Sequence, residues 1–418
     1  MGALGAQRGP TMSLPQRRPE GTARILHTSD WHLGMSRWFL DADAQPRFDE
    51  ARLAAVERLF DIARSRDCEA IVVAGDVFDS NFLEPRTWRR ALDVLRRTPV
   101  PLYLLPGNHD SLDPSSVYRQ PEFEGLEQGG SAGVRVLRNS EAQEVRPGLV
   151  IFGAPLLSRY GAEDVVGRAL SAVREDCGAA PPGEARVLVG HGRVQSWGSE
   201  MALDVIDVDA AVAACEQRLV DYIALGDTHS AMRLHDSGRA WYSGSPEVTD
   251  YREEDGTGES ASGFALIVDI AADPLGGDSP AQVAVEQVPV GQWTFAAVDA
   301  RMDGLEDVHA LVERLDCFPH PRTTVVKYGL EGTIDLATSG ELERQLNELR
   351  PKFAALYPRH SRDRVHVVPG ESEIAEAFPT AGVVGRVAEE LSLLAQTTPK
   401  AEDALKLLYR LSHTQDGK

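Results

Sequence analysis

The chain has 418 residues, more than a single hydrophobic core usually serves, so we expect two domains and a tail. Apolar residues make up 42% and charged residues 26%, close to ordinary globular usage, which excludes a wholly disordered chain. A formal net charge of -21, with no basic tract, argues against binding nucleic acid through unaided electrostatic attraction.

Residues 1–22 and the cysteines indicate in which compartment the protein works. Residues 1–22 are rich in Gly, Pro and Arg, lack the apolar stretch of a signal peptide, and are predicted to be a disordered extension. No later segment is apolar enough to span a membrane. Because Cys68, Cys177, Cys215 and Cys317 are widely spaced, we expect reduced thiols in a cytoplasmic protein.

Residues 23–275 alternate apolar runs of strand length with amphipathic segments. The segments Ala51–Arg64 and Trp88–Arg97 carry apolar residues at helical spacing. This alternation predicts an α/β domain in which sheet strands are buried between covering layers. The predicted strands are Ile25-Leu26, Ala70–Ala74, Leu102–Leu105, Val187–Val189, Tyr222–Leu225 and Phe264–Ile270.

A Pro- and Gly-rich stretch at Asp273–Pro280 indicates a domain boundary. Residues 285–370 then predict a small α/β domain, and residues 373–418 a helical tail. The predicted elements are strands Thr294–Met302, Thr323–Leu330 and Arg364–Val368, helices Leu305–Leu315 and Glu341–Leu356, and tail helices Val383–Leu394 and Ala401–Leu411.

Five polar clusters follow predicted strands of the first domain. The carboxyl edge of an open α/β sheet is where ligands are assembled, so we expect these clusters to converge. Their mixed carboxylate, amide and imidazole groups suit Mn²⁺, Fe²⁺ or Zn²⁺, and glycines fit the sharp turns that convergence needs. The clusters are Ser29-Asp30-Trp31-His32, Gly75-Asp76-Val77-Phe78-Asp79, Gly107-Asn108-His109-Asp110, Gly190-His191-Gly192 and Gly226-Asp227-Thr228-His229.

This series of clusters resembles the calcineurin-like metallophosphoesterase superfamily. Within it, the segments Ile25–Gly34, Val73–Asp79 and Tyr242–Pro246 resemble the SbcD family of DNA-repair nucleases. The resemblance implies a four-layer β-sandwich flanked by helices, a small C-terminal α/β capping domain and two divalent metal ions. It covers the first domain strongly and the later one only in general layout.

The resemblance also implies roles for individual residues. Asp30, His32 and His229 would hold one metal ion, Asn108 and His191 would hold the other, and Asp76 would bridge them. His109 would face the substrate phosphate as proton donor or transition-state stabiliser, with Asp110 a candidate to orient it. Two such ions can activate a water and stabilise both oxygens of an in-line displacement.

Asp227 departs from the family pattern, because the last motif of the family usually reads Gly-His-x-His. Our hypothesis is that a further carboxylate makes the site prefer harder ions, with Mn²⁺ expected over Zn²⁺.

Two residues in or near the clusters are not interpreted as metal ligands. Asp79 is interpreted as an outer carboxylate that fixes a ligating group, and His27 as a buried, hydrogen-bonded core residue.

Three functions are compatible with these residues. The leading one is a metal-dependent DNA nuclease, exonuclease and endonuclease both being open. For it the family implies a homodimer and a coiled-coil ATPase partner resembling SbcC that binds through C-terminal helices. The alternative is a stand-alone metallophosphoesterase acting on nucleotides or small phosphoesters, which suits the negative charge better. A scaffold that has lost catalysis is the third, supported only by Asp227.

Overall fold

The fold is seen in a computed structural model, in which the chain divides into two compact units, each described here by itself. Unit 1 comprises the chain up to Ser36, Pro46–Thr249 and Glu259–Gln292; unit 2 comprises Arg37–Gln45, Asp250–Gly258 and the chain from Trp293 onward. The structure describes residues 18, 21–129, 133–161, 163–194, 204–255, 257–273, 275, 280–359, 364–367, 382–395, 397–398, 400–401, 403–405 and 407–408.

Unit 1 contains two six-stranded sheets that mix parallel and antiparallel pairs. In the first sheet β1, β2, β3 and β4 pair in parallel, and β11 and β12 are added antiparallel at one edge. In the second, β6, β7, β8 and β10 pair in parallel, and β5 and β9 are antiparallel edge strands. The first sheet has the order β12 (Gln282–Pro289), β11 (Phe264–Ala271), β1 (Ala23–Thr28), β2 (Ala70–Val73), β3 (Leu102–Leu104), β4 (Val134–Val136). The second has the order β5 (Gln143–Arg146), β6 (Leu149–Ala154), β7 (Ala185–His191), β8 (Tyr222–Gly226), β10 (Ala240–Tyr242), β9 (Met232–Arg233).

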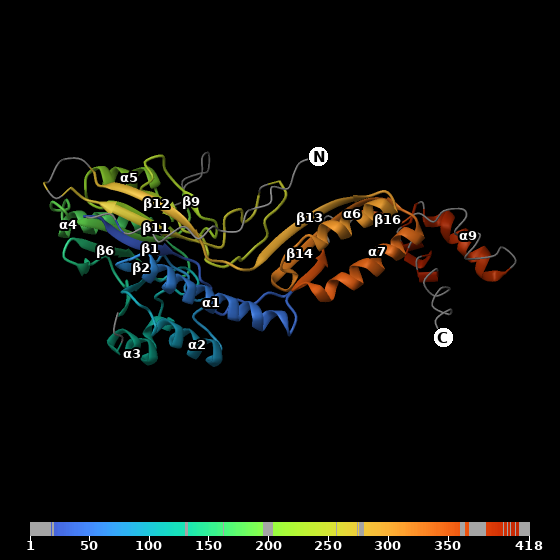
Figure 1. Ribbon diagram of the computed structural model, residues 1–418, viewed down its shortest axis with the longest axis horizontal. Coiled ribbons are helices and arrows are strands. Elements are labelled where there is room, and N and C mark those ends of the chain that lie inside the picture. Colours follow the sequence, from blue (N-terminus) through green and yellow to red (C-terminus); the bar gives the residue numbers. More distant parts are fainter. Residues whose placement is uncertain are drawn as a thin grey trace. The chain divides into compact units, whose positions relative to one another are not determined.

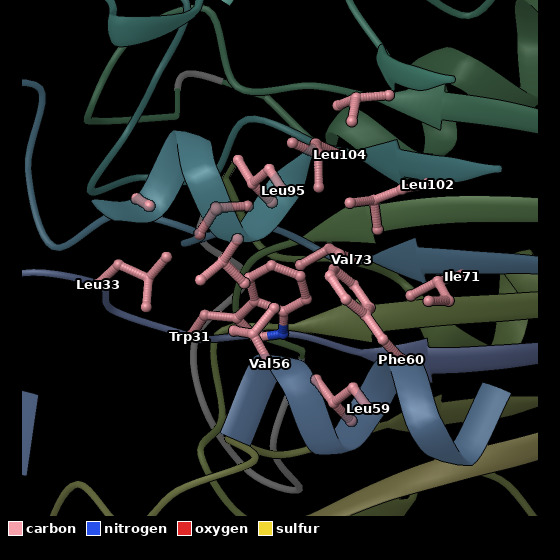
Figure 2. Close-up of a cluster of buried hydrophobic side chains, with 14 of the residues drawn as sticks. Trp31, Leu33, Val56, Leu59, Phe60, Ile71, Val73, Leu95, Leu102 and Leu104 are labelled. Carbon is pink, nitrogen blue, oxygen red and sulfur yellow. The ribbon is translucent and has the colours of Figure 1, made fainter. Parts of the chain in front are cut away.

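The central strands are buried on both faces because their side chains alternate between two apolar clusters. In β2, Ala70 and Val72 belong to the cluster shared by the two sheets, whereas Ile71 and Val73 belong to the cluster under the helices of the first sheet. Figure 2 shows the cluster between the first sheet and its helices, where Val56 and Leu59 of a covering helix pack with strand residues such as Ile71.

Helices complete the four layers of unit 1 (Figure 1). The first sheet is covered by α1 (Ala44–Ser65), α2 (Pro85–Leu95) and α3 (Pro121–Gly129), and the second by α4 (Val165–Asp176) and α5 (Val208–Glu216). A 3-10 turn, η1, spans Val117–Arg119. The predicted four-layer α/β sandwich is therefore confirmed.

Unit 2 is built on strand β14 (Thr324–Ile334), which pairs in parallel with β13 (Thr294–Met302), β15 (Ala355–Pro358) and β16 (Arg364–Val367). Helices α6 (Leu305–Asp316) and α7 (Leu336–Leu349) pack on side chains of one face of β14, and η2 spans Pro321–Thr323. The side chain of Asp335 begins α7 by accepting a hydrogen bond from the backbone of Thr338.

The predicted helix Glu341–Leu356 is wrong at its C-terminal end. Helix α7 ends at Leu349, a 3-10 turn η3 follows at Arg350–Lys352, and residues 355–358 form β15 instead. The physical reason is Pro351, which has no backbone N–H to donate and clashes with the carbonyl one turn earlier in a helix.

Aromatic side chains from the two inserted segments of unit 2 pack with its sheet residues. Phe39 stacks on Tyr357 with ring centroids 5.4 Å apart, and Tyr251 lies 5.3 Å from Phe295. Trp38 is 81% exposed, although its ring lies 5.2 Å from that of Tyr357. Residues 37–45 and 250–258 therefore belong to the packing of unit 2, whereas the sequence placed both inside residues 23–275.

The tail is described in part. Helix α9 spans Val383–Ala395, where the sequence predicts a helix. Residues 409–411 of the second predicted tail helix, residues 368–381, and residues 1–17 and 19–20 of the predicted extension lie outside the described residues. Within the described chain, no helix has both the length and the apolar character required to cross a membrane.

Candidate metal centre

The polar clusters meet in unit 1, where strands of both sheets end. Asp30 and His32 follow β1, Asp76 follows β2, and His109 follows β3 of the first sheet; His191 ends β7 of the second. Three overlapping groups of side chains have ligand atoms close enough to hold a metal ion. They are Asp30, His32 and His229; His32, Asp76 and His109; and Asp30, Asp76 and His191.

The backbone is strained at these donors. Within the described chain, the non-glycine residues with positive φ include Asp30 at 53°, His32 at 43°, Asp76 at 53° and Asp227 at 109°. Such conformations cost of order 1–3 kcal/mol each and persist where the surrounding structure enforces them, commonly at functional sites. The strain places these side chains together instead of leaving them along their strands.

One side of the centre is formed by Asp30, His32 and His229. The Nε2 atoms of the two histidines lie 3.2 Å apart, and Asp30 Oδ1 lies 4.0 Å from His32 Nε2. Each Nδ1 faces a carboxylate, at 3.3 Å from Asp79 Oδ1 for His32 and at 2.9 Å from Glu259 Oε1 for His229. When each Nδ1 carries the proton that faces its carboxylate, both Nε2 lone pairs point into the centre.

The other side is formed by Asn108, His191 and Asp227. His191 Nδ1 donates to the Ala74 carbonyl at 2.7 Å, which leaves Nε2 facing Asn108 Oδ1 at 2.8 Å. Asp227 Oδ1 lies 3.8 Å from the same nitrogen, and the Asp227 backbone N–H donates to Asp30 at 3.3 Å. Burial raises the pKa of Asp227, so its charged form requires nearby positive charge.

Asp76 lies between the two sides. Its Oδ2 is 3.9 Å from His32 Nε2 and 3.4 Å from His191 Nε2. Its Oδ1 accepts the His109 backbone N–H at 2.9 Å. Burial acts to raise the pKa of Asp76, but the neighbouring His191 and His32 lower it below its ordinary value. This position is the one that a carboxylate shared by two cations requires.

The arrangement of lone pairs fits divalent cations. When each histidine is neutral with its proton on Nδ1, lone pairs face each other at 3.2 Å between His32 and His229 and at 2.8 Å between His191 and Asn108, and a cation between them relieves the repulsion. Burial acts to lower the pKa of His191, but the carboxylates of Asp76, Asp30 and Asp227 raise it well above its ordinary value. The centre therefore attracts positive charge, and its oxygen and imidazole donors suit Mn²⁺, Fe²⁺ or Zn²⁺.

His109 lies beside this donor set, but Asp110 does not orient it. His109 Nδ1 lies 2.9 Å from the Asp79 carbonyl oxygen, and its ring centroid is 4.8 Å from that of His32. The fully buried Asp110 carboxylate instead accepts from the Tyr118 hydroxyl at 2.6 Å and from two backbone N–H groups. Burial, with the charge of Asp76, raises the pKa of Asp110 to about 6. Asp110 thus holds the loop together.

Glycine is required where the clusters approach most closely. Gly75 has φ of 90°, and a Cβ added there would lie 2.1 Å from His191 Nδ1. A Cβ at Gly107 would lie 2.2 Å from Asp76 Oδ1. The first glycine provides the sharp turn that the sequence predicts, whereas the second provides space beside a donor.

Two residues that contact the donors were missed in the sequence. Glu259 and Thr249 both contact His229 Nδ1, at 2.9 and 2.5 Å. They lie in the loop region after Tyr242-Ser243-Gly244-Ser245-Pro246, and the only available signal was their proximity in sequence to that motif. The interpretation of His27 is confirmed, because its ring nitrogens contact the Tyr222 hydroxyl at 3.0 Å and the Leu225 carbonyl at 3.1 Å.

A cavity of about 370 Å³ opens on the side of Asn108, His191 and Asp227. Arg159 and Tyr160, from the loop after β6, also line it. Tyr160 is 81% exposed. The volume lies within the range of about 300–1,000 Å³ that is usual for small-molecule sites.

A four-layer sandwich with these donors at its strand ends has the composition of a metal-dependent hydrolase. The family model described as Calcineurin-like phosphoesterase matches residues 23–255. The chain belongs to this family, which confirms the resemblance, and it is a phosphoester-hydrolysing enzyme whose fold implies divalent metal ions.

Curated relatives of the chain carry nuclease or repair names. It is 38% identical over 94 residues to the SbcD component of the nuclease SbcCD of Escherichia coli (strain K12), covering 21% of this chain and 22% of the relative. It is 21% identical over 324 residues to "DNA double-strand break repair protein Mre11" of Sulfolobus acidocaldarius, covering 75% of this chain and 76% of the relative. The corresponding SbcCD nuclease component of Rhodobacter capsulatus is 26% identical over 256 residues, covering 53% and 62%.

The match to the Escherichia coli protein spans about a fifth of that protein. What the relatives do as whole proteins therefore bears on this chain only as a proposal.

Proposed function

We propose that the protein is a two-metal DNA nuclease that hydrolyses phosphodiester bonds in DNA repair or recombination. The observation that carries the proposal is the convergence of donors on both sides of Asp76, with Asp30, His32 and His229 on one side and Asn108 and His191 on the other. Relatives named as components of a nuclease and as double-strand break repair proteins support DNA as the substrate.

Two divalent ions bound here would supply an activated water and stabilise the attacking and leaving oxygens. Asp76 holds its carboxylate between the two sides, and the flanking histidines keep their Nε2 lone pairs directed inward. His109 donates from Nδ1 to the Asp79 carbonyl, so a second proton, on Nε2 of the imidazolium, would be the one delivered to the leaving oxygen, and the ring would return to the neutral form.

We propose Mn²⁺ as the preferred ion. Asp227 adds a carboxylate beside His191, at 3.8 Å from its Nε2, where the family usually has an imidazole. Carboxylate oxygens favour harder ions, whereas imidazole suits Zn²⁺.

The cavity beside Asn108 is the proposed path for the nucleotide next to the scissile bond. An exposed aromatic ring can stack on any base, and an arginine can pair with a backbone phosphate. Tyr160 and Arg159 supply these two groups at the wall of the cavity that contains His191. These local contacts offset the unfavourable net charge of -21.

The partners implied by the family are likewise proposals. We propose a homodimer and a coiled-coil ATPase resembling SbcC, which would dock on the tail. Helix α9 exposes apolar side chains, with Val383 at 70% and Leu393 at 67%, as expected for a helix that binds in a partner's groove. The described cysteines are unpaired, in keeping with work in the cytoplasm.

The test compares substrates in Mn²⁺: double-stranded DNA, single-stranded DNA, cyclic nucleotides and bis(p-nitrophenyl) phosphate. We expect DNA to be hydrolysed with the highest kcat/KM. Hydrolysis of only the small phosphoesters would replace DNA with a nucleotide substrate and overturn the proposal. Binding of Mn²⁺ without hydrolysis of any phosphoester would identify a scaffold instead.

The Tyr160→Ala and Arg159→Ala variants refine this test. Loss of a stacked base costs about 1–3 kcal/mol, so kcat/KM for single-stranded DNA is expected to fall roughly tenfold. Hydrolysis of bis(p-nitrophenyl) phosphate, which has no base to stack, is expected to change little. Arg89→Ala, an exposed arginine on α2, serves as the matched control. An equal loss with both substrates would exclude the cavity as a nucleotide path.

A further inference from the structure

We propose that Glu259 and Thr249 are positioning residues that hold His229 with its Nε2 directed into the metal centre. They would thereby set the metal affinity of one side of the centre, formed by Asp30, His32 and His229. The inference rests on the proposed function only in requiring that the centre bind divalent ions. It does not depend on DNA as the substrate.

The contacts between these residues form a closed set. His229 Nδ1 lies 2.9 Å from Glu259 Oε1 and 2.5 Å from Thr249 Oγ1. The Thr249 hydroxyl donates to Glu259 Oε1, and the Thr249 backbone N–H donates to Glu259 Oε2 at 3.0 Å. Both carboxylate oxygens of Glu259 are therefore engaged, and the carboxylate cannot turn away from the ring without breaking other hydrogen bonds.

Burial strengthens the effect of this carboxylate. The Glu259 side chain is 8% exposed, whereas that of His229 is 30% exposed. A hydrogen bond to a charged group is stronger where water is excluded. Glu259 therefore fixes the ring more firmly than a surface ion pair would.

The chemical consequence is a fixed tautomer. With Glu259 ionised, the proton of neutral His229 lies on Nδ1, and Nε2 keeps its lone pair 3.2 Å from His32 Nε2. A carboxylate behind an imidazole also raises its basicity as a ligand. Removing the carboxylate would allow the ring to rotate and to place its proton on Nε2, where it would exclude a cation.

The second side of the centre supplies an internal reference. His191 is held by the backbone carbonyl of Ala74, a contact in which neither residue 249 nor residue 259 takes part. The proposal therefore predicts an effect on one side of the centre only. A residue that merely held its loop in place would leave both sides unchanged or weaken both through unfolding.

The test is calorimetric titration of Mn²⁺ into the metal-free full chain carrying Glu259→Ala, Glu259→Gln or Thr249→Val. Loss of an outer partner typically weakens metal affinity 10–100-fold, so we expect a shift of about that size in one of two binding events for Glu259→Ala. Glu259→Gln, which keeps the shape and an acceptor oxygen, is expected to be intermediate, and Thr249→Val to have the smallest effect. The other binding event is expected to be unchanged.

Glu254→Gln is the matched control, because Glu254 contacts the Asp299 backbone and Arg314, both in unit 2. Melting temperature in excess chelator verifies that each variant folds. Unchanged affinity for both ions in Glu259→Ala, or equal weakening of both in the folded isosteric Glu259→Gln variant, would overturn the proposal. A wild-type protein that binds Mn²⁺ normally but does not cleave DNA would overturn the proposed function alone.

Discussion

The metal centre of unit 1 and one charged cluster of unit 2 differ in how their buried carboxylates are neutralised. In unit 1, the carboxylates of Asp30 and Asp76 are almost fully buried, and the side chains facing them are histidines, which are charged only when protonated. In unit 2, Glu253 pairs with Lys327 at 2.6 Å and with Arg359 at 2.7 Å. In the unit 2 cluster the carboxylate is neutralised by permanent positive charges, whereas the carboxylates of the unit 1 centre face side chains that carry no permanent charge.

This contrast separates a structural cluster from a functional one. A carboxylate already paired with lysine and arginine has no need of a metal ion, and removing one partner of such a pair destabilises the fold. A buried set of carboxylates and imidazoles without permanently charged partners is stabilised by whatever cation enters. Within the described residues, the groups able to hold a metal ion all come from unit 1.

The strongest test of the contrast is Asp76→Asn. Because Asp76 lies between both sides, the loss of its charge is expected to lower phosphodiester hydrolysis on the order of 10³-fold and to weaken both Mn²⁺ binding events. Single-turnover kinetics and calorimetry measure the two effects. Full activity in the variant, or full activity of the wild type in excess EDTA, would remove the basis for a metal centre.

His109→Gln is expected to have the next largest effect. Loss of a general acid costs typically 10²–10⁴-fold, so kcat should fall by roughly 10²-fold or more. Affinity for Mn²⁺ should change little, because the Asp30, His32 and His229 group and the Asp30, Asp76 and His191 group remain intact. Measuring kcat and the calorimetric affinity for Mn²⁺ in the same variant distinguishes a proton donor from a metal ligand. A loss of metal binding equal to the loss of activity would assign His109 to the ligands.

Glu253→Gln tests the unit 2 cluster, where the expected effect is on stability alone. Burial acts to raise the pKa of Glu253, but Lys327 and Arg359 lower it below its ordinary value of 4.5. The charge therefore contributes stability above pH 4.5, and this contribution is lost as the pH falls through the lowered pKa. At pH 7 we expect a loss of about 1.5–3 kcal/mol.

Guanidinium-induced unfolding at pH 7 and at pH 3 measures this difference. The difference in the free energy of unfolding between the wild type and the Glu253→Gln variant should be smaller at pH 3 than at pH 7. A gap that stays constant with pH would show that the charge of Glu253 is not the cause.

Asp227→His is expected to have the smallest effect. Replacing the carboxylate with an imidazole should move the ratio of activities in Zn²⁺ and Mn²⁺ toward Zn²⁺, roughly threefold to tenfold. Activity titrations with each metal measure the ratio. An unchanged metal preference would show that Asp227 does not tune the centre from its position 3.8 Å from His191.

The sequence was most informative where the signal is local. Strands β1, β2, β3, β7 and β8 are apolar runs that end in glycine-containing clusters, so both the strands and the donors after them could be predicted. The end of α7 could also have been predicted. Apolar residues continue at helical spacing beyond Pro351, but a proline inside a helix ends or kinks it, and α7 ends just before this residue.

Other features depend on tertiary contacts and could not be predicted. The short strands β4 and β9 acquire their conformation by pairing with β3 and β10, not from their own residues. The partner of His229 lies 30 residues further along the chain, at a spacing that follows no secondary-structure period. Asp110 was misjudged for a related reason, because adjacency to His109 in sequence does not bring the two side chains into contact.

The two inserted segments of unit 2 have a consequence for how the histidines of one metal are held in the chain. Residues 250–258 leave unit 1 after Thr249 and return at Glu259, the same two residues whose side chains contact His229. Residues 37–45 leave a few positions after His32. A change in the length of residues 250–258 would therefore act directly on the two residues that hold His229, whereas the Ala74 carbonyl that holds His191 lies outside this segment.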